Sequence, residues 1–311
     1  VVGGRYLATG TVEYVRWLAC YWLTGSKTVQ AYWMLQGEGA NGKTRFLGAL
    51  MRAWGDYAKT TGFNTFDADK HEDKGDDLAE LRAARLVFAS EVDEDRPLAE
   101  ARMKAIAGGD PITCRHLYGR FFTYYPAFKP VLAVNVLPVV RGQDHGTWRR
   151  IRVIRFCRTF DPTAEPTLEA TLATEAAGIL NWAISGARDF LQAGGATLPE
   201  PASVRDWADA YRAESDTLGR WLAECVIDRP GAFTASRSLY ASYFLWCKDA
   251  GHMPKSRTGW ARDLARKYPK AYRDTVRPRG YEGLGLLSLE DKNAPDAPDK
   301  PAFSPNFLTR G

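Results

Sequence analysis

A glycine-rich segment between a predicted strand and a predicted helix is the feature that most constrains the fold. It reads Gly37-Glu38-Gly39-Ala40-Asn41-Gly42-Lys43-Thr44 and fits the pattern GxxxxGK[ST]. Residues 29–36 before it are rich in β-branched and aromatic types, which predicts a strand, and residues 43–54 after it carry a helical pattern. Strand, glycine loop and helix in this order begin an α/β nucleotide-binding unit.

The residue types in this segment suit a bound phosphate. Glycines permit the unusual backbone angles with which N–H groups wrap an anion, and the helix that follows adds its N-terminal dipole. We expect Lys43 to reach the β- and γ-phosphates and the Thr44 hydroxyl to bind Mg²⁺. ATP and Mg²⁺ are therefore the expected cofactors, held also by Gly37, Gly39, Ala40, Asn41 and Gly42. A chance glycine-rich turn is the alternative, which the flanking strand and helix disfavour.

Three further apolar runs, at residues 85–90, 131–136 and 152–156, predict buried strands. Continuous rather than alternating apolar residues favour a parallel sheet covered on both faces. The first run ends at Glu91, at the carboxyl end of its strand, where α/β sheets bind ligands. We expect Glu91 to hold Mg²⁺ or activate water, with Glu94 or Asp93 assisting. The alternative is that all three are solvated loop acids.

Polar residues beside two other strands complete the predicted hydrolytic set. Asn135 ends the run 131–135, where an amide can orient the attacking water and sense the γ-phosphate. An asparagine in that place is otherwise usually a turn residue. Arg149 and Arg150 precede the run 152–156. Multimeric NTPases need an arginine supplied to the γ-phosphate of a neighbouring subunit. We assign this role to Arg150, with Arg149 as the second candidate and a surface ion pair as the alternative.

Composition indicates a globular protein with a mild excess of basic residues. The chain has 311 residues, of which 45% are hydrophobic and 25% charged, and a net charge of +5. Five scattered cysteines without a CxxC pair argue against a disulfide framework or a zinc site. The sequence shows no signal peptide and no apolar run near the ~20 residues that span a bilayer, so we expect a cytoplasmic protein without a membrane partner. The chain begins at Val1 rather than methionine, which indicates a fragment of a longer protein.

Two segments are candidates for contact with a polyanion. Strand-like runs flank Tyr118-Gly119-Arg120, which predicts a hairpin between residues 112 and 125. Nine basic residues against two acidic ones leave +7 between residues 254 and 280, more than the whole chain carries, and Trp260, Tyr268 and Tyr272 lie among them. The helical patterns there, followed by a possible hairpin at 280–289, suggest a winged-helix fold. A solvated basic face is the alternative.

The order of these features resembles the superfamily 3 helicases, and more closely the helicase part of phage, plasmid and poxvirus-type primase-helicases. The resemblance covers roughly residues 11–260. Its matching segments are 37–44, 85–91, Lys104, 108–113, Arg115, 117–118, 129–135, Pro138, 148–150 and 178–182. It implies an AAA+-like ATPase core that forms a hexameric ring, threads single-stranded DNA and moves 3′ to 5′. Family members often carry a primase upstream and a longer helical collar; only about 28 residues precede the first strand here.

The resemblance also implies which residues contact DNA. In that family a hairpin before the asparagine strand points into the ring pore, where basic groups pair with phosphates and an aromatic stacks on a base. We accordingly expect contacts from Lys104, Arg115, His116, Tyr118 and Arg120. An ordinary surface hairpin is the alternative.

We expect an α/β chain with five segments. They are a short N-terminal helical segment (1–28), an AAA+-like P-loop ATPase core with a parallel sheet (29–160), a helical segment (161–230), a basic winged-helix-like domain (231–290) and a disordered, proline-rich tail (291–311). Strand signals stop after about Phe160, and residues 228–231 predict a turn or linker.

The predicted function is an ATP-dependent replicative DNA helicase or translocase that acts on single-stranded or forked DNA as a ring, in the cytoplasm of a host cell. Two alternatives are a P-loop ATPase that remodels protein or packages DNA without unwinding it, and an origin-binding protein in which ATP only controls assembly. Separation of a forked duplex distinguishes the first alternative. The full hydrolytic set disfavours the second.

Overall fold

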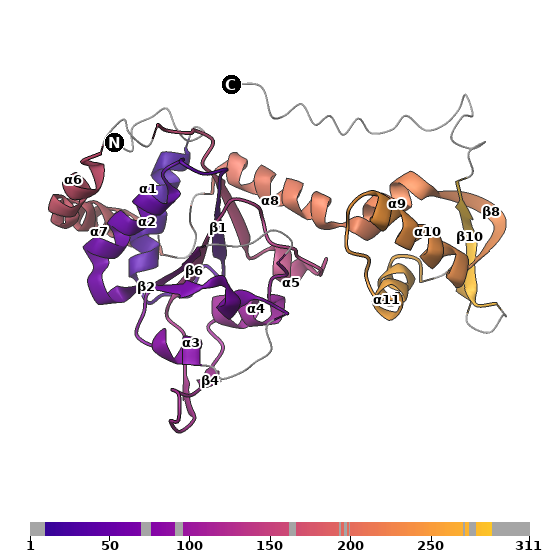
Figure 1. Cartoon of the computed structure of the whole chain (residues 1–311), viewed down its shortest axis with the longest axis horizontal. Coiled ribbons are helices and arrows are strands. Elements are labelled where there is room, and N and C mark those ends of the chain that lie inside the picture. Colours follow the sequence, from indigo (N-terminus) through magenta and orange to yellow (C-terminus); the bar gives the residue numbers. More distant parts are fainter. Residues whose placement is uncertain are drawn as a thin grey trace. The chain divides into compact units, whose positions relative to one another are not determined.

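A computed structural model describes residues 10–69, 76–90, 96–161, 166–192, 194–195, 198, 200–269, 271–273 and 278–287. The chain divides into two compact units, Val1–Ser215 and Asp216–Gly311, and Figure 1 shows the elements of each. The expected tail at 291–311 lies outside the described residues. No helix among the described residues is both long and apolar enough to cross a membrane.

A parallel sheet forms the centre of the first unit. Its strands lie in the order β2-β3-β6-β1-β7, and each neighbouring pair is parallel. The strands are β1 (Tyr32–Gln36), β2 (Ala58–Gly62), β3 (Leu86–Ser90), β6 (Lys129–Val134) and β7 (Ile151–Arg155). The expected parallel sheet is therefore present. Strand β2 was missed because Ala58 is the one buried residue of this edge strand, so Ala-Lys-Thr-Thr-Gly shows no apolar run.

Helices cover both faces of this sheet (Figure 1). They are α1 (Thr11–Leu23), α2 (Lys43–Trp54), α3 (Asp76–Glu80), α4 (Glu100–Gly108), α5 (His145–Trp148), α6 (Leu168–Thr174), α7 (Ala176–Gln192) and α8 (Ala202–Ser215). Side chains of β1 alternate between two core clusters. Tyr32 and Met34 pack with residues of α4 and α8, whereas Trp33 and Leu35 pack with residues of α1, α2 and α7. Burial on both faces explains why the strands read as continuous apolar runs.

The N-terminal helix α1 is an integral part of the first unit. It lies within the predicted helical segment and packs against α7, where an ideal Cβ on Gly186 would lie 3.1 Å from the Arg16 carbonyl oxygen. The rings of Trp22 and Trp33 meet edge to face, 5.5 Å apart, and the Trp33 indole donates to the Tyr14 hydroxyl at 3.2 Å. These contacts revise the expected boundary at residue 28, because α1 shares one core with β1.

The second unit is built around a small antiparallel sheet of order β8-β10-β9. Its elements are α9 (Thr217–Cys225), β8 (Val226–Ala235), α10 (Ser236–Asp249), α11 (Arg257–Lys267), β9 (Tyr272–Arg273) and β10 (Gly280–Leu286). Aromatic side chains pack together within its core: the ring of Trp221 lies 5.7 Å from that of Tyr243 and 6.1 Å from that of Trp260. Ten described residues form this buried cluster, which includes Tyr281 of β10.

Three expectations for the C-terminal half were wrong. Strands do follow residue 160, namely β8, β9 and β10. The predicted linker at 228–231 lies within β8, where the register with β10 shifts between Glu282 and Leu284, and Pro230 with left-handed Gly231 suits that irregularity. The predicted hairpin at 280–289 is instead a single strand over 280–286 that pairs with β8 and β9.

The boundary between the units also differs from the expected one. Residues 202–226 carry a helical pattern throughout, yet the helix ends at Ser215 and a new one begins after Asp216. The Asp216 side chain accepts from the Gly219 backbone N–H at 2.9 Å and so caps α9. The helices α6, α7 and α8 therefore belong to the first unit, and α9 to the second.

Two lysines, of which Lys129 is buried and Lys27 half-buried, lie at the amino-terminal edge of the parallel sheet. Lys129, at the start of β6, is 1% exposed; its ammonium donates to the Thr24 carbonyl and lies 4.8 Å from the Tyr21 ring centroid. Lys27 donates to the Phe128 carbonyl and, at 2.8 Å, to the Ile106 carbonyl at the end of α4. Desolvation lowers the pKa of Lys27 to about 7 and that of Lys129 to about 6.

These shifts predict that the protein becomes more stable as the pH rises from 7 to 9.5. In that window the unfolded chain keeps both lysines protonated, whereas the folded chain binds fewer protons, so the free energy of unfolding increases with pH. The substitution Lys129→Met removes one of the two sites and should flatten the increase. Urea unfolding at several pH values measures both slopes. Equal slopes for the wild type and Lys129→Met would contradict the assignment.

Candidate nucleotide site

The glycine-rich segment connects the carboxyl end of β1 to the first turn of α2. Gly39, Ala40 and Gly42 have φ angles of +105°, +42° and +87°. Such left-handed angles turn the chain sharply, and glycine adopts them without strain. Ala40 is one of two non-glycine described residues with positive φ. The loop therefore has the curvature that a phosphate-binding turn requires.

Lys43 lies inside this loop rather than in solvent. It is 6% exposed, and its ammonium donates to the Gly37 carbonyl at 2.5 Å, to Asn41 Oδ1 at 3.0 Å and to Asn135 Oδ1 at 3.3 Å. Desolvation by burial lowers its pKa. These acceptors are neutral, and no ion pair of Lys43 occurs among the described residues. A positive charge is thus available to an anion in the loop.

Asn41 adds a second polar group to the loop. The residue is 6% exposed, and its Nδ2 atom has no hydrogen-bond partner among the described residues. Its side chain lies over Gly37, where an ideal Cβ would be 2.0 Å from that Nδ2 atom. A buried donor without a partner, a buried ammonium and a left-handed turn together fit a phosphate group. Thr44, the predicted Mg²⁺ ligand, lies exposed in the first turn of α2.

Sheet topology explains how Asn135 reaches Lys43. Strands β1 and β6 are parallel neighbours with Gln36 opposite Val134, and the Gly37 backbone N–H donates to the Val134 carbonyl at 3.1 Å. Asn135 directly follows Val134, so it lies beside the start of the loop. The structure therefore brings together Lys43 and Asn135, which are 92 residues apart in the sequence.

Strand β3 ends at the same edge of the sheet. It pairs with β6 in parallel, with Ala89 opposite Leu132, and its last residue is Ser90. The predicted acids Glu91, Asp93 and Glu94 follow in the sequence but lie outside the described residues. Their assignment stays a prediction. No group of three or more histidine, cysteine, aspartate or glutamate residues that could hold a metal occurs in the described part of the chain.

The two candidate arginines lie at the opposite end of the sheet. Arg150 precedes Ile151, which pairs with Tyr32 at the first residue of β1, whereas the loop follows Gln36 at its last. Five strand residues span about 16 Å at ~3.3 Å each. Arg150 Nη2 and Arg149 Nη2 donate to Gln30 Oε1 at 3.1 and 3.0 Å. Neither arginine therefore belongs to the nucleotide site of its own chain.

Lys104, a predicted DNA contact outside the hairpin, lies beside the arginines. It lies on α4, and its ammonium is 3.4 Å from Asp144 Oδ1. An ideal Cβ on Gly146 would lie 3.8 Å from Arg150 Nη1 and 3.9 Å from Lys104 Cδ. The sequence did not point to Gln30 or Asp144, because neither stands in a recognisable motif.

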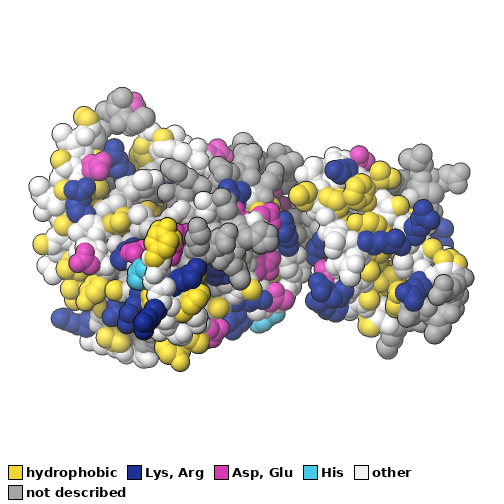
Figure 2. Space-filling model, turned by 60° about the horizontal axis from the view of Figure 1, so that its bottom comes forward, with side chains coloured by type: hydrophobic (Ala, Val, Ile, Leu, Met, Phe, Trp, Pro, Cys, Tyr) yellow, Lys and Arg dark blue, Asp and Glu magenta, His cyan; other side chains and the backbone are white. Residues whose placement is uncertain are grey.

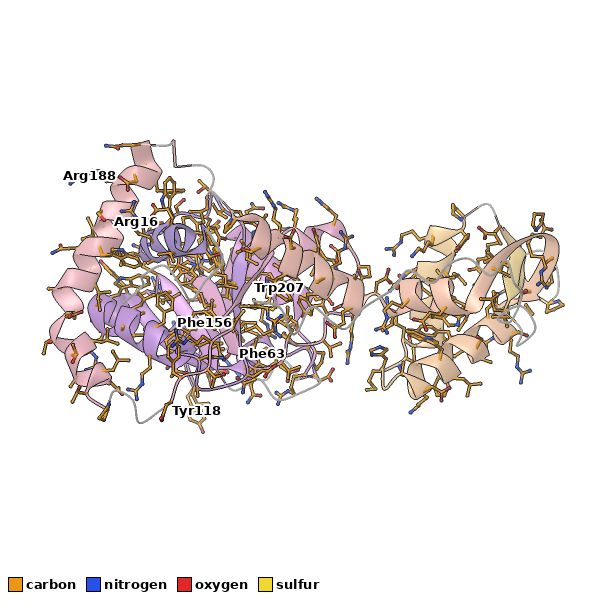
Figure 3. All side chains as sticks on the ribbon, turned by 90° about the horizontal axis from the view of Figure 1, so that it is seen from above. Arg16, Phe63, Tyr118, Phe156, Arg188 and Trp207 are labelled. Atoms are coloured by element: carbon orange, nitrogen blue, oxygen red, sulfur yellow. The ribbon has the colours of Figure 1, made fainter. Side chains whose placement is uncertain are left out.

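The expected hairpin is present between α4 and β6. Strands β4 (Ile112–Cys114) and β5 (Phe122–Tyr124) pair antiparallel, with Thr113 opposite Thr123. At its tip Tyr118 has a φ of +60° and is 97% exposed, and Figure 3 shows it projecting from the ribbon. Figure 2 shows basic and hydrophobic side chains side by side on the forward-facing surface, which is the lower side of Figure 1 that carries the hairpin.

The other hairpin candidates divide into anchored and exposed side chains. The Arg115 guanidinium lies 4.9 Å from the Phe121 ring centroid. His116 stacks on Phe122 and lies 3.1 Å from a Glu80 oxygen of α3, which ties the base of the hairpin to that helix. Arg120 is exposed. An exposed basic and aromatic tip on an anchored base suits contact with an extended polyanion.

Two glycine-to-alanine substitutions, one in the loop and one in α2, test the loop geometry. An ideal Cβ on Gly37 would also lie 2.7 Å from the Phe156 carbonyl, a backbone atom, so Gly37→Ala should lower the free energy of unfolding by about 1–3 kcal/mol. Gly48 in α2 has no atom within 4 Å of such a Cβ, so Gly48→Ala should raise it by about 0.5–1 kcal/mol. Chemical unfolding measures both, and a Gly37→Ala protein as stable as the wild type would contradict the packing described.

Comparisons with known proteins place the site in context. Residues 35–150 match a family model described as a family of unknown function, DUF5906. The chain is 34% identical over 158 residues to a protein of Acanthamoeba polyphaga mimivirus named as helicase L207/L206; the match covers 50% of this chain and 16% of that protein. It is 24% identical over 228 residues to a Frog virus 3 protein named as helicase 022R, covering 68% and 23% of the two chains.

Two further matches complete the comparison. A protein of African swine fever virus named as primase C962R is 23% identical over 217 residues, covering 64% of this chain and 22% of that protein. Among solved structures, the apo C-terminal region of NrS-1 matches with a TM-score of 0.49 and 13% identity, covering 89% of this chain and 72% of that chain. The chain thus spans less than a quarter of the viral relatives named here, and it is similar to viral proteins named as helicase or primase.

Proposed function

We propose that the first unit is an ATP-hydrolysing motor that moves along single-stranded DNA, as the helicase part of a longer replication protein. The observation that carries the proposal is the contact of Lys43 in the glycine loop with Asn135 from the neighbouring parallel strand. A buried cation and an amide then share one edge of the sheet, where a triphosphate and its attacking water meet. Similarity to viral proteins named as helicases supports the choice of DNA as the partner.

In this proposal each polar residue at the loop edge of the sheet has its own role in hydrolysis. The loop backbone and Lys43 hold the β- and γ-phosphates, and Asn135 orients the attacking water. Mg²⁺, held by Thr44 and Glu91, neutralises charge on the phosphate oxygens. Glu94 or Asp93 assists Glu91 in activating the water.

Arg150, with Arg149 as the second candidate, is proposed to act on the nucleotide of a neighbouring subunit. Its place at the far end of β7 excludes a role at the loop of its own chain. A neighbour that presents its arginine edge to this loop would complete the site, and such contacts generate a ring when the rotation closes. A hexamer that encircles single-stranded DNA is the assembly we propose.

Two surfaces are proposed to contact DNA. The hairpin offers Tyr118 for base stacking and Arg115, His116 and Arg120 for phosphates, with Lys104 as a more distant candidate. In the second unit, the order α9-β8-α10-α11-β9-β10 with its β8-β10-β9 sheet supports a winged-helix-like fold, in which α11 is proposed as the helix that enters a groove.

The exposed residues of α11 indicate which part of the basic region 254–280 could contact DNA. Arg257, Arg262 and Arg266 are exposed, although Arg266 lies 3.5 Å from Asp263, whereas Lys255 is 2.8 Å from Asp263 and mostly buried. Lys267 lies 3.8 Å from Asp216.

The basic side chains of the second unit also favour a second candidate function, the binding of a cognate duplex origin. Footprinting on duplex DNA without nucleotide distinguishes that function from translocation.

The trans-acting arginine can be tested by mixing variants. Lys43→Ala should abolish hydrolysis because it removes the phosphate cation, and Arg150→Ala should lose ~10³–10⁵ in rate. Mixed in equal amounts, the two should recover activity at about a quarter of the interfaces of a head-to-tail ring, those that pair an intact loop with an intact arginine. ATP hydrolysis with and without single-stranded DNA is the measurement.

The control for this experiment is Arg188→Ala, an exposed arginine on α7 that should retain wild-type hydrolysis. No recovery at any mixing ratio would overturn the trans-acting role. Hydrolysis that is indifferent to DNA, without separation of a forked duplex, would favour a remodelling or packaging ATPase.

The hairpin assignment predicts a specific loss of DNA binding. Removing the exposed ring in Tyr118→Ala should weaken binding of a labelled single-stranded oligonucleotide about tenfold, because base stacking contributes about 1–3 kcal/mol. Fluorescence anisotropy measures the affinity. Tyr57→Ala, which removes a 51% exposed tyrosine next to α2, is the matched control. Equal affinities for Tyr118→Ala and the control would exclude the tip as a contact.

A further inference from the structure

The segment that follows β7 passes beside the glycine loop. The Phe156 backbone N–H donates to the Gln36 carbonyl at 2.8 Å, and the Phe160 backbone N–H donates to the Ala40 carbonyl at 2.7 Å. These two bonds fix the segment at both its ends against β1 and the loop. Figure 3 labels Phe156 within the first unit; its ring lies 6.3 Å from that of Phe46 on α2.

The Phe160 side chain is exposed although it touches the loop. It is 41% exposed, and its Cε2 atom is 3.9 Å from an ideal Cβ on Gly42. The Arg158 guanidinium lies over its ring, 5.2 Å from the centroid. The backbone hydrogen bond already holds this exposed ring beside the loop. Binding of a flat apolar ligand therefore needs little further loss of conformational entropy at this residue.

We propose that Phe160 is the platform on which the base of a bound nucleotide stacks. The inference rests on the proposed function, because it takes the phosphates to lie in the glycine loop. In a nucleotide held there, the ribose is the short link between the phosphates and the base. The exposed Phe160 ring beside Gly42 therefore lies within reach of the base and offers it a π-face. Arg158 over the ring supplies a cation that favours the same stack.

This geometry also indicates the substrate class. Stacking accepts any base, because every base has a π-face, and it strengthens with the size of that face. The site should therefore bind purine nucleoside triphosphates more tightly than pyrimidine ones, without strict choice between the purines. Exposed apolar rings also mark protein contacts, so a neighbouring subunit is the competing occupant of Phe160.

The test compares a nucleotide with its phosphates alone. Binding of ATP and of inorganic tripolyphosphate, each with Mg²⁺, is measured by calorimetry on the full chain. Phe160→Ala should weaken ATP binding about tenfold and leave tripolyphosphate binding unchanged, because it removes only the stack. Phe160→Trp should restore ATP affinity. Phe244→Ala, a similarly exposed phenylalanine (38%) of the second unit, is the matched control and should change neither.

Each other outcome overturns a defined statement. Equal losses for ATP and tripolyphosphate in Phe160→Ala would mean that the ring only shapes the loop. No loss for either ligand would mean that the base lies elsewhere, and both results would overturn this inference while leaving the proposed function intact. A wild-type chain that binds neither ligand would overturn the proposed function and this inference with it. Thermal unfolding of Phe160→Ala confirms that the variant is folded.

Discussion

The position of β1 between β6 and β7, in a sheet whose neighbours are all parallel, is the constraint on which the rest of the first unit depends. Parallel strands end at one edge, so the glycine loop after Gln36 and the amide of Asn135 meet there. The same alignment moves Arg150 to the other edge. One topological fact thus places the residues proposed to hold a triphosphate and the arginine proposed to act on a neighbour at opposite edges of the sheet.

Buried and half-buried polar groups at the two edges of the sheet differ in the hydrogen bonds that they already make. At the loop edge, the Lys43 ammonium faces three neutral oxygens, and Asn41 Nδ2 has no partner among the described residues. At the other edge, Lys27 donates to the Ile106 carbonyl of α4 and Lys129 to the Thr24 carbonyl just after α1, and desolvation lowers the pKa of both lysines. The polar groups at the loop edge therefore keep hydrogen-bonding capacity for a ligand. The two lysines at the other edge instead spend theirs on contacts that join α1, α4 and β6.

Much of the first unit could be predicted from sequence because its central strands are buried on both faces and its loop needs particular residue types. Edge strand β2 shows no such pattern, and β8 was hidden because Pro230-Gly231 reads as a turn although it lies at an irregularity within a strand. Motif order led us to expect Lys43 and Asn135 each at the γ-phosphate, but not their direct contact. Phe160, Gln30 and Asp144 were missed, because their importance lies in what the fold brings next to them rather than in their own spacing.

The glycine loop and the Arg150 side chain lie at opposite edges of the sheet, which affects how activity would depend on protein concentration. If each site takes its arginine from the next chain, the contact is head-to-tail, and a free chain holds two incomplete halves that cannot meet. Hydrolysis then becomes a property of the interface, so turnover per chain should rise with protein concentration until assembly is complete. Dilution alone would switch such a motor off without any change in the fold of its subunits.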